Sequence, residues 1–392
     1  MMFTREKIEA LEEKNLAPYA MKSKYTAGRK YQEPKCANRT CYQRDRDRIV
    51  HSEAFRKLEY KTQVFVIFEG DYYRTRLTHT IEVAQIARSI GRSLQLNEDL
   101  IEAIALAHDL GHSPFGHAGE IALNSLMKGI GGFNHNFHSF EIVTEIEKRY
   151  PGFKGLNLSQ EVLIGILKHE TDYDDKGDFE EYRNIGPTFE AKVVDVADGL
   201  AYLSHDIDDG LTSGCISKED LMESQLWQKA ASKIDSGLEK SNIEMFKYQI
   251  VRALIDVQIK DMLGYSDEKL EESGFKSSDE VKNYNLKRSK HVIIGYSPEM
   301  KSQRDFLQDL VNEKLYKHFR VERMTSKASR IINDLFKVYK DNPMQLPYAV
   351  YPRDRAYSEE EKLKIICNHI ALMTDRFALD EHKKLFNPYQ KV

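Results

Sequence analysis

Apolar residues recur at helical spacing along most of the 392-residue chain. Between residues 80 and 94 (TIEVAQIARSIGRSL) they fall largely on one face, as in an amphipathic helix. The same pattern predicts further helices over 98–110, 118–127, 140–150, 161–169 and 189–206. No run with period-two alternation competes, although residues 63–68 (QVFVIF) fit a short strand or a buried turn. The predicted fold class is therefore all-α.

Helix start signals and composition predict how the chain is organised. Pro187-Thr188 precedes the helix expected from Phe189, and Ser297-Pro298-Glu299 resembles an N-cap followed by proline at the first helical position. Residues 265–290 are polar and poor in core residues, which favours an exposed excursion. Most helices of the last 150 or so residues are amphipathic and need a partner surface. We expect three parts: an N-terminal basic arm (1–50), a core (51–240), and a C-terminal helical accessory region (241–392) packed on that core.

Composition describes an ordinary soluble globular protein, with 41% hydrophobic and 31% charged residues. No stretch of eighteen apolar residues occurs, so we expect no membrane span. The N-terminus is charged and lacks an apolar core, so no secretory signal is visible and a cytoplasmic location is expected. Cys36 and Cys41 lack a second matching pair, which makes reduced thiols a better interpretation than a zinc ribbon.

Charge is unevenly distributed despite a net charge of −4. Residues 22–48 hold nine Lys or Arg against three acids. Such a basic arm can meet nucleotide phosphates or single-stranded nucleic acid. A solvated loop in which the arginines of RDRDR pair with the neighbouring aspartates explains the composition equally well.

Two imidazoles and two carboxylates, each on a segment with helical periodicity, suit a metal ion: His79, His108, Asp109 and Asp198. This mixed N/O set fits Mn, Fe, Co or Zn, and tolerates Mg. Adjacent helical residues point about 100° apart, so His108 and Asp109 converge only near a helix end, which Gly111 supplies. A lone His-Asp pair is a weak signal, since such an aspartate equally often holds a core histidine. Here an unpaired carboxylate would close a very apolar helix at a high cost.

A second cluster follows directly. His108, His112, His117, Asp109 and Glu120 place three histidines and two acids within thirteen residues. His117 and Glu120 are i and i+3, so they share a face of a helix. A carboxylate beside an imidazole raises its basicity and orients it, which suits a general acid or base.

Asp198, Tyr202 and Asp206 are spaced i, i+4 and i+8, so they form one stripe of one helix. Asp198 completes the expected metal ligands. Tyr202 can stack on or hydrogen-bond a sugar, and Asp206 can accept a hydrogen bond from a hydroxyl. A solvated acidic face is the alternative, but a tyrosine between two acids reads better as a pocket wall.

Five segments together resemble the deoxyguanosinetriphosphate triphosphohydrolase-like family of HD-domain proteins: RDRDRIVHSEAFRKLEYKTQVF, RTRLTHTIEVAQIAR, ALAHDLGHSPFGHAGE, FNHNFHSFEIV and FEAKVVDVADGLAYLSHDIDDGL. The match is densest from about residue 40 to 215, and the C-terminal helices look similar to that family's accessory region. The resemblance implies an HD-domain helical core with an additional C-terminal helical region. It also implies cleavage of a dNTP (dGTP or several dNTPs) between the 5′ oxygen and the α-phosphorus, giving deoxynucleoside and inorganic triphosphate.

The same resemblance assigns roles to residues by position. The metal ligands it implies are His79, His108, Asp109 and Asp198. The catalytic pair at the α-phosphate is His117 with Glu120. From these roles we expect a mechanism in which the metal ion and Arg76 draw charge from the α-phosphate, and in which His117, kept protonated by Glu120, donates a proton to the leaving 5′ oxygen. Positions that contact the phosphates or complete the site are Arg76, His112 and His135. Positions that recognise the sugar, with Tyr excluding a 2′-hydroxyl, are Gln63, Tyr202 and Asp206.

Relatives in this family are commonly oligomers, often hexamers, and some need a dNTP at a second site, so a homo-oligomer and a dNTP activator are implied. Two other function classes stay open: a nucleotide-sensing or single-stranded nucleic-acid-binding protein, and an HD phosphohydrolase acting on cyclic dinucleotides, nucleoside monophosphates or alarmones. The His117–Glu120 pair argues against a purely binding role, and the stripe at Tyr202 argues against another nucleotide substrate. Neither base preference nor metal identity follows from the spacing.

Overall fold

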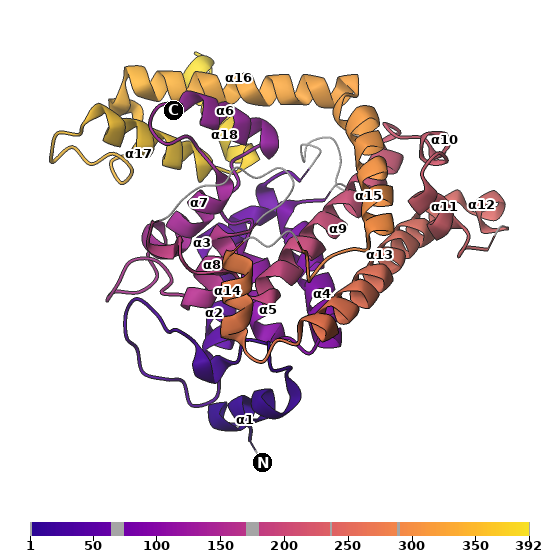
Figure 1. The fold of residues 1–392 in the computed structure, drawn as a ribbon. Coiled ribbons are helices and arrows are strands. Elements are labelled where there is room, and N and C mark those ends of the chain that lie inside the picture. The colour runs from indigo at the N-terminus through magenta and orange to yellow at the C-terminus, as the bar shows by residue number, and fades with distance from the viewer. Residues whose placement is uncertain (1, 64–73, 170–179, 236, 288–290, 392) are drawn as a thin grey trace.

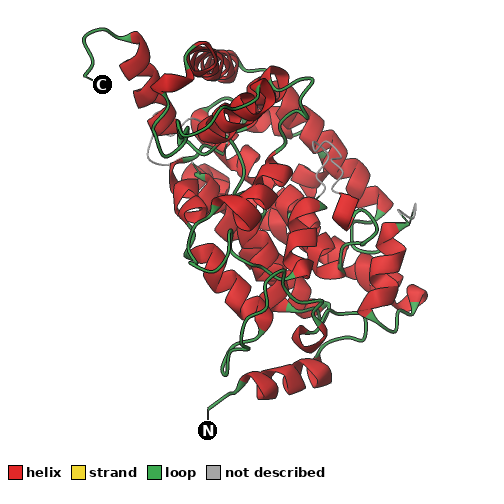
Figure 2. Cartoon of the chain, turned by 90° about the vertical axis from the view of Figure 1, so that its left-hand side faces the viewer, coloured by secondary structure: helices red, strands yellow, loops and turns green. Residues whose placement is uncertain are grey.

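The computed structural model describes residues 2–63, 74–169, 180–235, 237–287 and 291–391. Every regular element among them is a helix, and their only β-type pairings are isolated bridges such as Arg29 with Ser159 (Figure 1, Figure 2). The predicted all-α class is therefore confirmed. Of the segment 63–68, only Gln63 lies within the described residues.

The helices follow one another along the whole chain. The first nine are α1 (Arg5–Asn15), α2 (Cys41–Val50), α3 (Glu53–Lys57), α4 (Arg76–Ser93), α5 (Glu98–Ala107), α6 (His117–Leu126), α7 (His135–Glu141), α8 (Gln160–Leu167) and α9 (Phe189–Ser213). The next nine are α10 (Lys218–Leu221), α11 (Gln225–Ala231), α12 (Leu238–Ser241), α13 (Ile243–Ser273), α14 (Ser278–Leu286), α15 (Pro298–Val311), α16 (Phe319–Asp341), α17 (Glu359–Ala371) and α18 (Asp375–Phe386). Short 3-10 helices span Ser23–Tyr25, Leu58–Tyr60, Glu180–Tyr182 and Pro343–Gln345, and π-helical turns span Ile142–Ile146 and Asn312–Tyr316.

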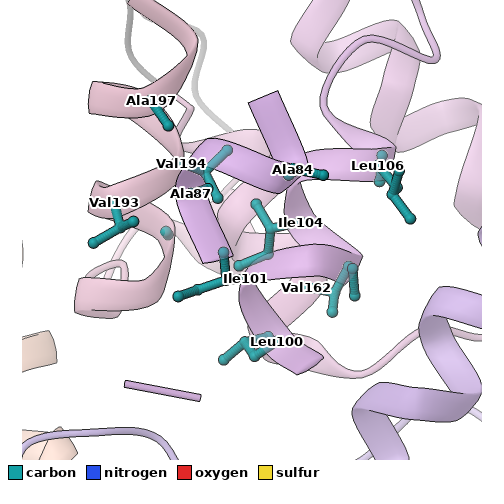
Figure 3. Packing of buried hydrophobic residues seen from close by; sticks show 14 of the residues in the cluster. Ala84, Ala87, Leu100, Ile101, Ile104, Leu106, Val162, Val193, Val194 and Ala197 are labelled. Carbon is teal, nitrogen blue, oxygen red and sulfur yellow. The ribbon is translucent and has the colours of Figure 1, made fainter. Parts of the chain in front are cut away.

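Helices α4, α5 and α9 form the centre of the fold, with α4 packed against both of the others. Each begins at a residue whose side chain accepts a backbone N–H of the first turn, and these N-caps are Thr75, Asn97 and Thr188. Their apolar faces meet α8 in one core, where Ile104 and Val194 are buried (Figure 3). Burial of each such side chain contributes about 1.5–3 kcal/mol.

Helix α5 ends at Ala107 and passes into a turn that carries the predicted His-Asp pair. Gly111 closes this turn at a point of close approach, because a Cβ there would lie 2.2 Å from Ser139 N and 2.3 Å from His135 O. The backbone of α7 therefore packs directly on the turn, and only glycine leaves room for it. This contact sets the position of His135 relative to the turn.

The structure corrects the bounds of one expected helix, and it shows that the segment 265–290, whose described residues are mostly exposed or half-buried, is largely helical. The helix expected over 140–150 begins at His135 and ends in a π-helical turn at Ile146, because the side chain of Asn134 caps α7 by accepting the N–H groups of Asn136 and Phe137. The excursion expected over 265–290 is helical where it is described: α13 continues to Ser273 and α14 follows. A narrow apolar stripe suffices there, since Leu270 and Val281 are buried in the main core.

The predicted start of α15 is confirmed, with Ser297 as N-cap and Pro298 as the first helical residue. Besides Leu270 and Val281 in the main core, two further apolar clusters join the later helices to the earlier ones. Helices α11, α13 and α15 cover the C-terminal half of α9, and α16 to α18 share a separate apolar cluster with α6 (Figure 1).

Within the basic arm, the described arginines pair with acids, as the alternative interpretation held. Arg29 pairs with Asp45, and Arg48 lies 2.8 Å from Glu33. The RDRDR stretch is not a solvated loop but part of α2, whose Tyr42 is buried in the core. The four cysteines are free thiols. No helix in the described part of the chain is both long and apolar enough to cross a bilayer.

Candidate active site

Three of the four expected metal ligands meet in one buried cluster. His79 comes from α4, His108 from the end of α5 and Asp198 from the middle of α9, and one ligand atom of each lies within 4.8 Å of the others. His79 Nε2 is 2.8 Å from Asp198 Oδ1, and His108 Nε2 is 3.7 Å from the same oxygen. Segments 119 residues apart therefore converge on one carboxylate.

The hydrogen bonds of the two imidazoles test whether this cluster fits a metal ion. His108 Nδ1 lies 2.6 Å from the carbonyl oxygen of Ala105, which only accepts, so Nδ1 carries the proton. In the neutral ring Nε2 is then a lone pair, and among the described residues it has no hydrogen-bond partner. This lone pair faces the carboxylates of Asp109 and Asp198, an arrangement that is repulsive until a proton or a cation lies between them.

His79 has the same arrangement. Its Nδ1 lies 3.1 Å from His205 Nδ1, and His205 Nε2 hydrogen-bonds Glu82. Burial lowers the pKa of His205 to about 4, with Glu82 opposing, so the ring is neutral near pH 7. Its Nε2–H donates to Glu82 and its Nδ1 accepts from His79, which leaves His79 Nε2 as a lone pair toward Asp198. Both imidazoles thus turn Nε2 toward a buried carboxylate, and a proton or a cation must lie between the two. Burial lowers the pKa of His108, but Asp109 and Asp198 outweigh burial and raise it, so a proton fills this place when no cation does. Two imidazole nitrogens and a carboxylate are a donor set that suits a divalent metal ion.

Asp109, the fourth expected ligand, lies beside the cluster rather than within it. Its Oδ1 is 3.4 Å from His108 Nε2 and 2.9 Å from His112 Nε2, while its Oδ2 accepts from Arg76 Nη1 at 3.0 Å. Burial raises the pKa of Asp109, but His108, Arg76 and His112 together outweigh burial and hold it well below its usual range. An ionised Asp109 therefore connects the group of His79, His108 and Asp198 to the histidine cluster around His112.

His169 also reaches the cluster, although the sequence reasoning gave it no role. It follows α8 and is buried, with Nδ1 2.8 Å from Asp195 Oδ1 and Nε2 3.4 Å from Asp198 Oδ2. Burial lowers its pKa, but Asp195 and Asp198 outweigh burial and raise it well above its usual value. A signal existed, because His169 comes two residues after the end of an apolar helix, α8, much as His108 directly follows α5.

The second cluster centres on Glu120 in the first turn of α6. Glu120 Oε1 accepts the backbone N–H of His135 at 2.9 Å and lies 2.9 Å from His135 Nδ1. His112 stacks on His135, with ring centroids 4.0 Å apart. His117 Nδ1 lies 3.9 Å from Glu120 Oε2, so the closest partner of Glu120 is His135 rather than the expected His117.

The protonation states of this cluster differ from the expectation. Burial raises the pKa of Glu120, but His135 above all lowers it well below its usual range. Burial and Arg76 lower the pKa of His117, with Glu120 opposing. The expectation that Glu120 keeps His117 protonated therefore does not hold for the substrate-free site, where His117 is mainly neutral at pH 7. The His117 side chain is 41% exposed, unlike the buried His112 and His135.

Two of the expected sugar-recognition residues, Tyr202 and Asp206, lie on α9, and the structure adds a third side chain beside them. Tyr316, in the π-helical turn after α15, donates to Asp206 Oδ2 at 2.9 Å and hydrogen-bonds the hydroxyl of Tyr202. No pattern near Tyr316 pointed to this role, since it lies 110 residues beyond Asp206. Burial raises the pKa of Asp206 well above its usual value. Gln63 Oε1 and Asp206 Oδ1 are buried and have no hydrogen-bond partner in the described part of the chain, as expected of atoms that await a ligand.

His117 links the histidine cluster around Glu120 to the residues around Tyr202, because its ring lies edge-on to the Tyr202 ring with centroids 6.3 Å apart. The structure thus connects the expected site residues other than Gln63 through side-chain contacts, from the group of His79, His108 and Asp198 through Asp109 and His112 to His117 and Tyr202. Gln63 joins them through its backbone, since a Cβ at Gly116 would lie 3.6 Å from Gln63 O.

A helical core in which His and Asp side chains from several helices meet is typical of HD-domain proteins, and residues 76–203 match the HD domain model. Residues 294–384 match the phosphohydrolase-associated domain. The chain is 46% identical to a deoxyguanosinetriphosphate triphosphohydrolase-like protein of Geobacter sulfurreducens over 393 residues, covering 100% of both chains. Proteins of the same name from Geobacter metallireducens (97% of both chains) and Ralstonia pickettii (95% of this chain, 94% of the relative) are 47% and 46% identical. The chain belongs to the deoxyguanosinetriphosphate triphosphohydrolase-like family of HD-domain proteins.

Proposed function

We propose that this chain is a metal-dependent hydrolase that cleaves a deoxynucleoside triphosphate between the 5′ oxygen and the α-phosphorus. The products are deoxynucleoside and inorganic triphosphate. The observation that carries the proposal is the buried cluster of His79, His108 and Asp198, which stands beside an accessible imidazole, His117. The relatives' shared name, deoxyguanosinetriphosphate triphosphohydrolase-like protein, supports the same reaction class.

The residues that would hold the metal ion are His79, His108 and Asp198, with Asp109 as the fourth ligand. A bound Mn, Mg, Fe, Co or Zn ion supplies charge neutralisation on the α-phosphate and lowers the pKa of the attacking water. His79 and His108 are held ready for it, because each has its Nδ1–H committed to another acceptor. The ionised state of Asp198 fits the same role: burial raises its pKa, but His108, His169 and His79 hold it well below its usual range.

Arg76 is the proposed electrostatic partner of the phosphates. Its Nη1 donates to Asp109, and its Nε is buried without a hydrogen-bond partner among the described residues. A guanidinium held in a buried site stabilises negative charge that develops on phosphate oxygens. His112 and His135 line the same side of the site and complete the phosphate contacts we propose.

His117 is the proposed general acid. The 5′ oxygen is a poor leaving group, so it must receive a proton as the P–O bond breaks. In the free site burial and Arg76 lower the pKa of His117. A bound triphosphate brings negative charge that offsets Arg76 and raises this pKa again. His117 therefore becomes an effective donor only when the substrate is present, and Glu120 supports it mainly by fixing His135.

The sugar site we propose combines Gln63, Tyr202 and Asp206, to which the contacts above add Tyr316. A protonated Asp206 can both donate to and accept from a 3′-hydroxyl. The Tyr202 and Tyr316 rings lie parallel, with centroids 6.5 Å apart, and they form a rigid wall. Such a wall excludes a 2′-hydroxyl by close packing, which favours deoxyribose.

The proposal extends to the organisation of the protein. Residues 1–50 form a basic arm, residues 51–240 the HD core and residues 241–392 the accessory region. The protein is cytoplasmic and assembles as a homo-oligomer, most specifically a hexamer. A dNTP bound at a second site is the proposed activator. Light scattering on the eluting protein, with and without dNTPs, tests the assembly. A monomer under both conditions would contradict this part of the proposal.

The decisive experiment incubates the metal-loaded full chain with each dNTP, singly and in pairs, and with the matching ribonucleotides. We expect inorganic triphosphate and deoxynucleoside, with little turnover of ribonucleotides. In ¹⁸O water, attack at phosphorus places the label in triphosphate and none in the nucleoside. Release of orthophosphate or pyrophosphate would refute the reaction. Binding of dNTP without turnover under any metal would instead support a sensing role, and nucleic-acid binding that survives EDTA would support the binding alternative.

A further inference from the structure

We propose that Asp375, the first residue of α18 in the accessory region, is a positioning residue that holds the active-site loop 112–117. The inference rests on the proposed role of His117, which is the first residue after this loop's positive-φ turn. Asp375 lies about 260 residues from the loop that it contacts.

One carboxylate joins two distant segments. Asp375 Oδ1 accepts the backbone N–H of Phe115 at 2.8 Å, and Oδ2 accepts the backbone N–H of Thr62 at 3.0 Å. The hydroxyl of Thr62 donates to the same Oδ2. Asp375 is 0% exposed, so none of these bonds competes with water. Charge-assisted bonds in such a site are about twice as strong as neutral ones.

The loop needs support from outside, because its own sequence does not stabilise it. Phe115 and Gly116 both have positive φ, at 66° and 59°. For the non-glycine Phe115 this conformation costs about 1–2 kcal/mol. Helix α6 also begins without a side-chain cap, since Gly116 occupies the N-cap position. The bond from Phe115 N to Asp375 therefore fixes the last turn before His117, where neither backbone preference nor a cap does so.

The second anchor, Thr62, lies directly beside the loop. A Cβ placed on Gly116 would be 3.6 Å from both Thr62 O and Gln63 O and 3.4 Å from Arg76 Nη2. The loop, Gln63 and Arg76 therefore lie close together. Asp375 fixes their relative position, because it hydrogen-bonds both Phe115 in the loop and Thr62 next to Gln63. Lys61, buried next to Thr62, adds a parallel link by donating to the carbonyl oxygens of His112 and Ala371.

The accessory region can act as a rigid holder, because it packs on the helix that it positions. Helix α6 shares an apolar cluster with α16 and α17 (Figure 1), in which Leu123 and Ile332 are fully buried. Asp375 sits at the N-terminus of the twelve-residue α18, where the helix dipole favours a carboxylate. The accessory region is therefore part of the catalytic geometry, and any shift of α18 moves the loop that carries His117.

The test compares Asp375→Asn with a matched control, Asp380→Asn, in the full metal-loaded chain. Asp380 lies on the same helix, but its side chain is 52% exposed and faces only Arg376 and Lys383 among the ion pairs of this helix. In Asp375→Asn the amide nitrogen cannot accept, so one loop anchor is lost. We expect kcat to fall about 100-fold, as a misplaced catalytic group does, with KM and metal content little changed. Asp380→Asn should match the wild type.

The pH profile separates positioning from general loss of folded protein. His117 faces Arg76, Glu120, His135 and Asp109 and lies beside the His112 and Tyr202 rings. Burial and the Arg76 guanidinium lower the pKa of His117 in the free site. A loosened loop lets the His117 ring move away from this guanidinium, so the kcat/KM limb of His117 should move upward in Asp375→Asn, toward the ordinary histidine range. A smaller folded fraction scales the rate at every pH and leaves the limb in place. An unmoved limb with unchanged kcat would overturn the proposal.

Hydrogen exchange supplies a readout that does not depend on hydrolysis. Peptides that cover residues 112–118 should exchange hydrogen faster in Asp375→Asn than in the wild type. In the control Asp380→Asn they should exchange at the wild-type rate. If the wild type hydrolyses no dNTP, the proposed function fails while exchange still decides whether Asp375 holds the loop. Where Asp375→Asn does not fold, Thr62→Val removes one donor to the same carboxylate. It should give smaller changes in the same direction, and wild-type behaviour of this variant would overturn the proposal.

Discussion

The chain Glu82–His205–His79 allows a sharp prediction about metal affinity. His205 accepts from His79 Nδ1 at 3.1 Å and donates through Nε2 to Glu82, while His79 Nε2 lies 2.8 Å from Asp198 Oδ1. His205 thus selects the tautomer of His79 that offers Nε2 to a cation. Replacing His205 by Ala leaves the His79 ring free to rotate and to protonate at Nε2. We expect weaker metal binding with no change in the direct ligands.

The size of the expected loss in metal affinity follows from the position of His205, which hydrogen-bonds the proposed metal ligand His79. Loss of such a partner typically weakens metal affinity about 10- to 100-fold, or about 1.4 to 2.8 kcal/mol. Glu82→Gln should lose less, because the amide oxygen still accepts from His205 Nε2–H. The two variants therefore form a graded pair, with His205→Ala the weaker binder.

Competition for Mn²⁺ between the metal-free chain and a fluorescent chelator measures the dissociation constant directly. His382→Ala serves as the control, since His382 pairs with Asp334 between α16 and α18 and contacts none of the proposed ligands. It should bind Mn²⁺ like the wild type. Equal dissociation constants for His205→Ala and the wild type would refute the reasoning, because the tautomer of His79 would then not depend on His205.

Three further predictions follow. His117→Ala should lower turnover at least about 100-fold, as loss of a general acid does, with metal content near normal; loss of the metal as well would make His117 a ligand. Dialysis against EDTA should abolish triphosphate release and added Mn²⁺ should restore it, whereas release that persists in EDTA would exclude a metal-dependent reaction. Burial lowers the pKa of Lys61 from 10.5 to about 7. Between these two pH values the unfolded chain therefore binds more protons than the folded chain. The free energy of unfolding then rises with pH across this window, by up to about 1.4 kcal/mol per pH unit. Lys61→Met should remove this slope from unfolding free energies measured by denaturant titration at pH 7.5, 8.5 and 9.5, and equal slopes in both proteins would refute the assignment.

Much of the fold was predictable because helices are local. Apolar spacing in α4, α5 and α9 depends on residues three and four apart, and the N-cap Ser297 with Pro298 acts within one turn. The exposure expected over 265–290 is confirmed in that most of its described residues are exposed or half-buried. The helix α14 was missed there because few apolar residues mark its spacing, and Val281 is its buried residue.

Part of the site was also predictable, since His108 and Asp109 close an apolar helix where an unpaired carboxylate is costly. Tyr202 and Asp206 followed from i, i+4 spacing on one helix. The sequence reasoning paired Glu120 with His117 for the same local reason. In the structure His135, fifteen residues away, is the closer partner, because Gly111 lets the backbone of α7 pack directly on the turn.

The sequence by itself determined the helical periodicity, the caps and the stripes, all of which arise from interactions within one or two turns. Only the tertiary structure decided that His169 and His205 border the metal cluster, that Tyr316 bonds Asp206, and that Asp375 bonds the loop before His117. These contacts depend on the rotation and register with which whole helices pack. A helix offers several faces with similar apolar content, so the apolar spacing within it does not determine which face packs inward. The packing of all the helices in the common core determines it.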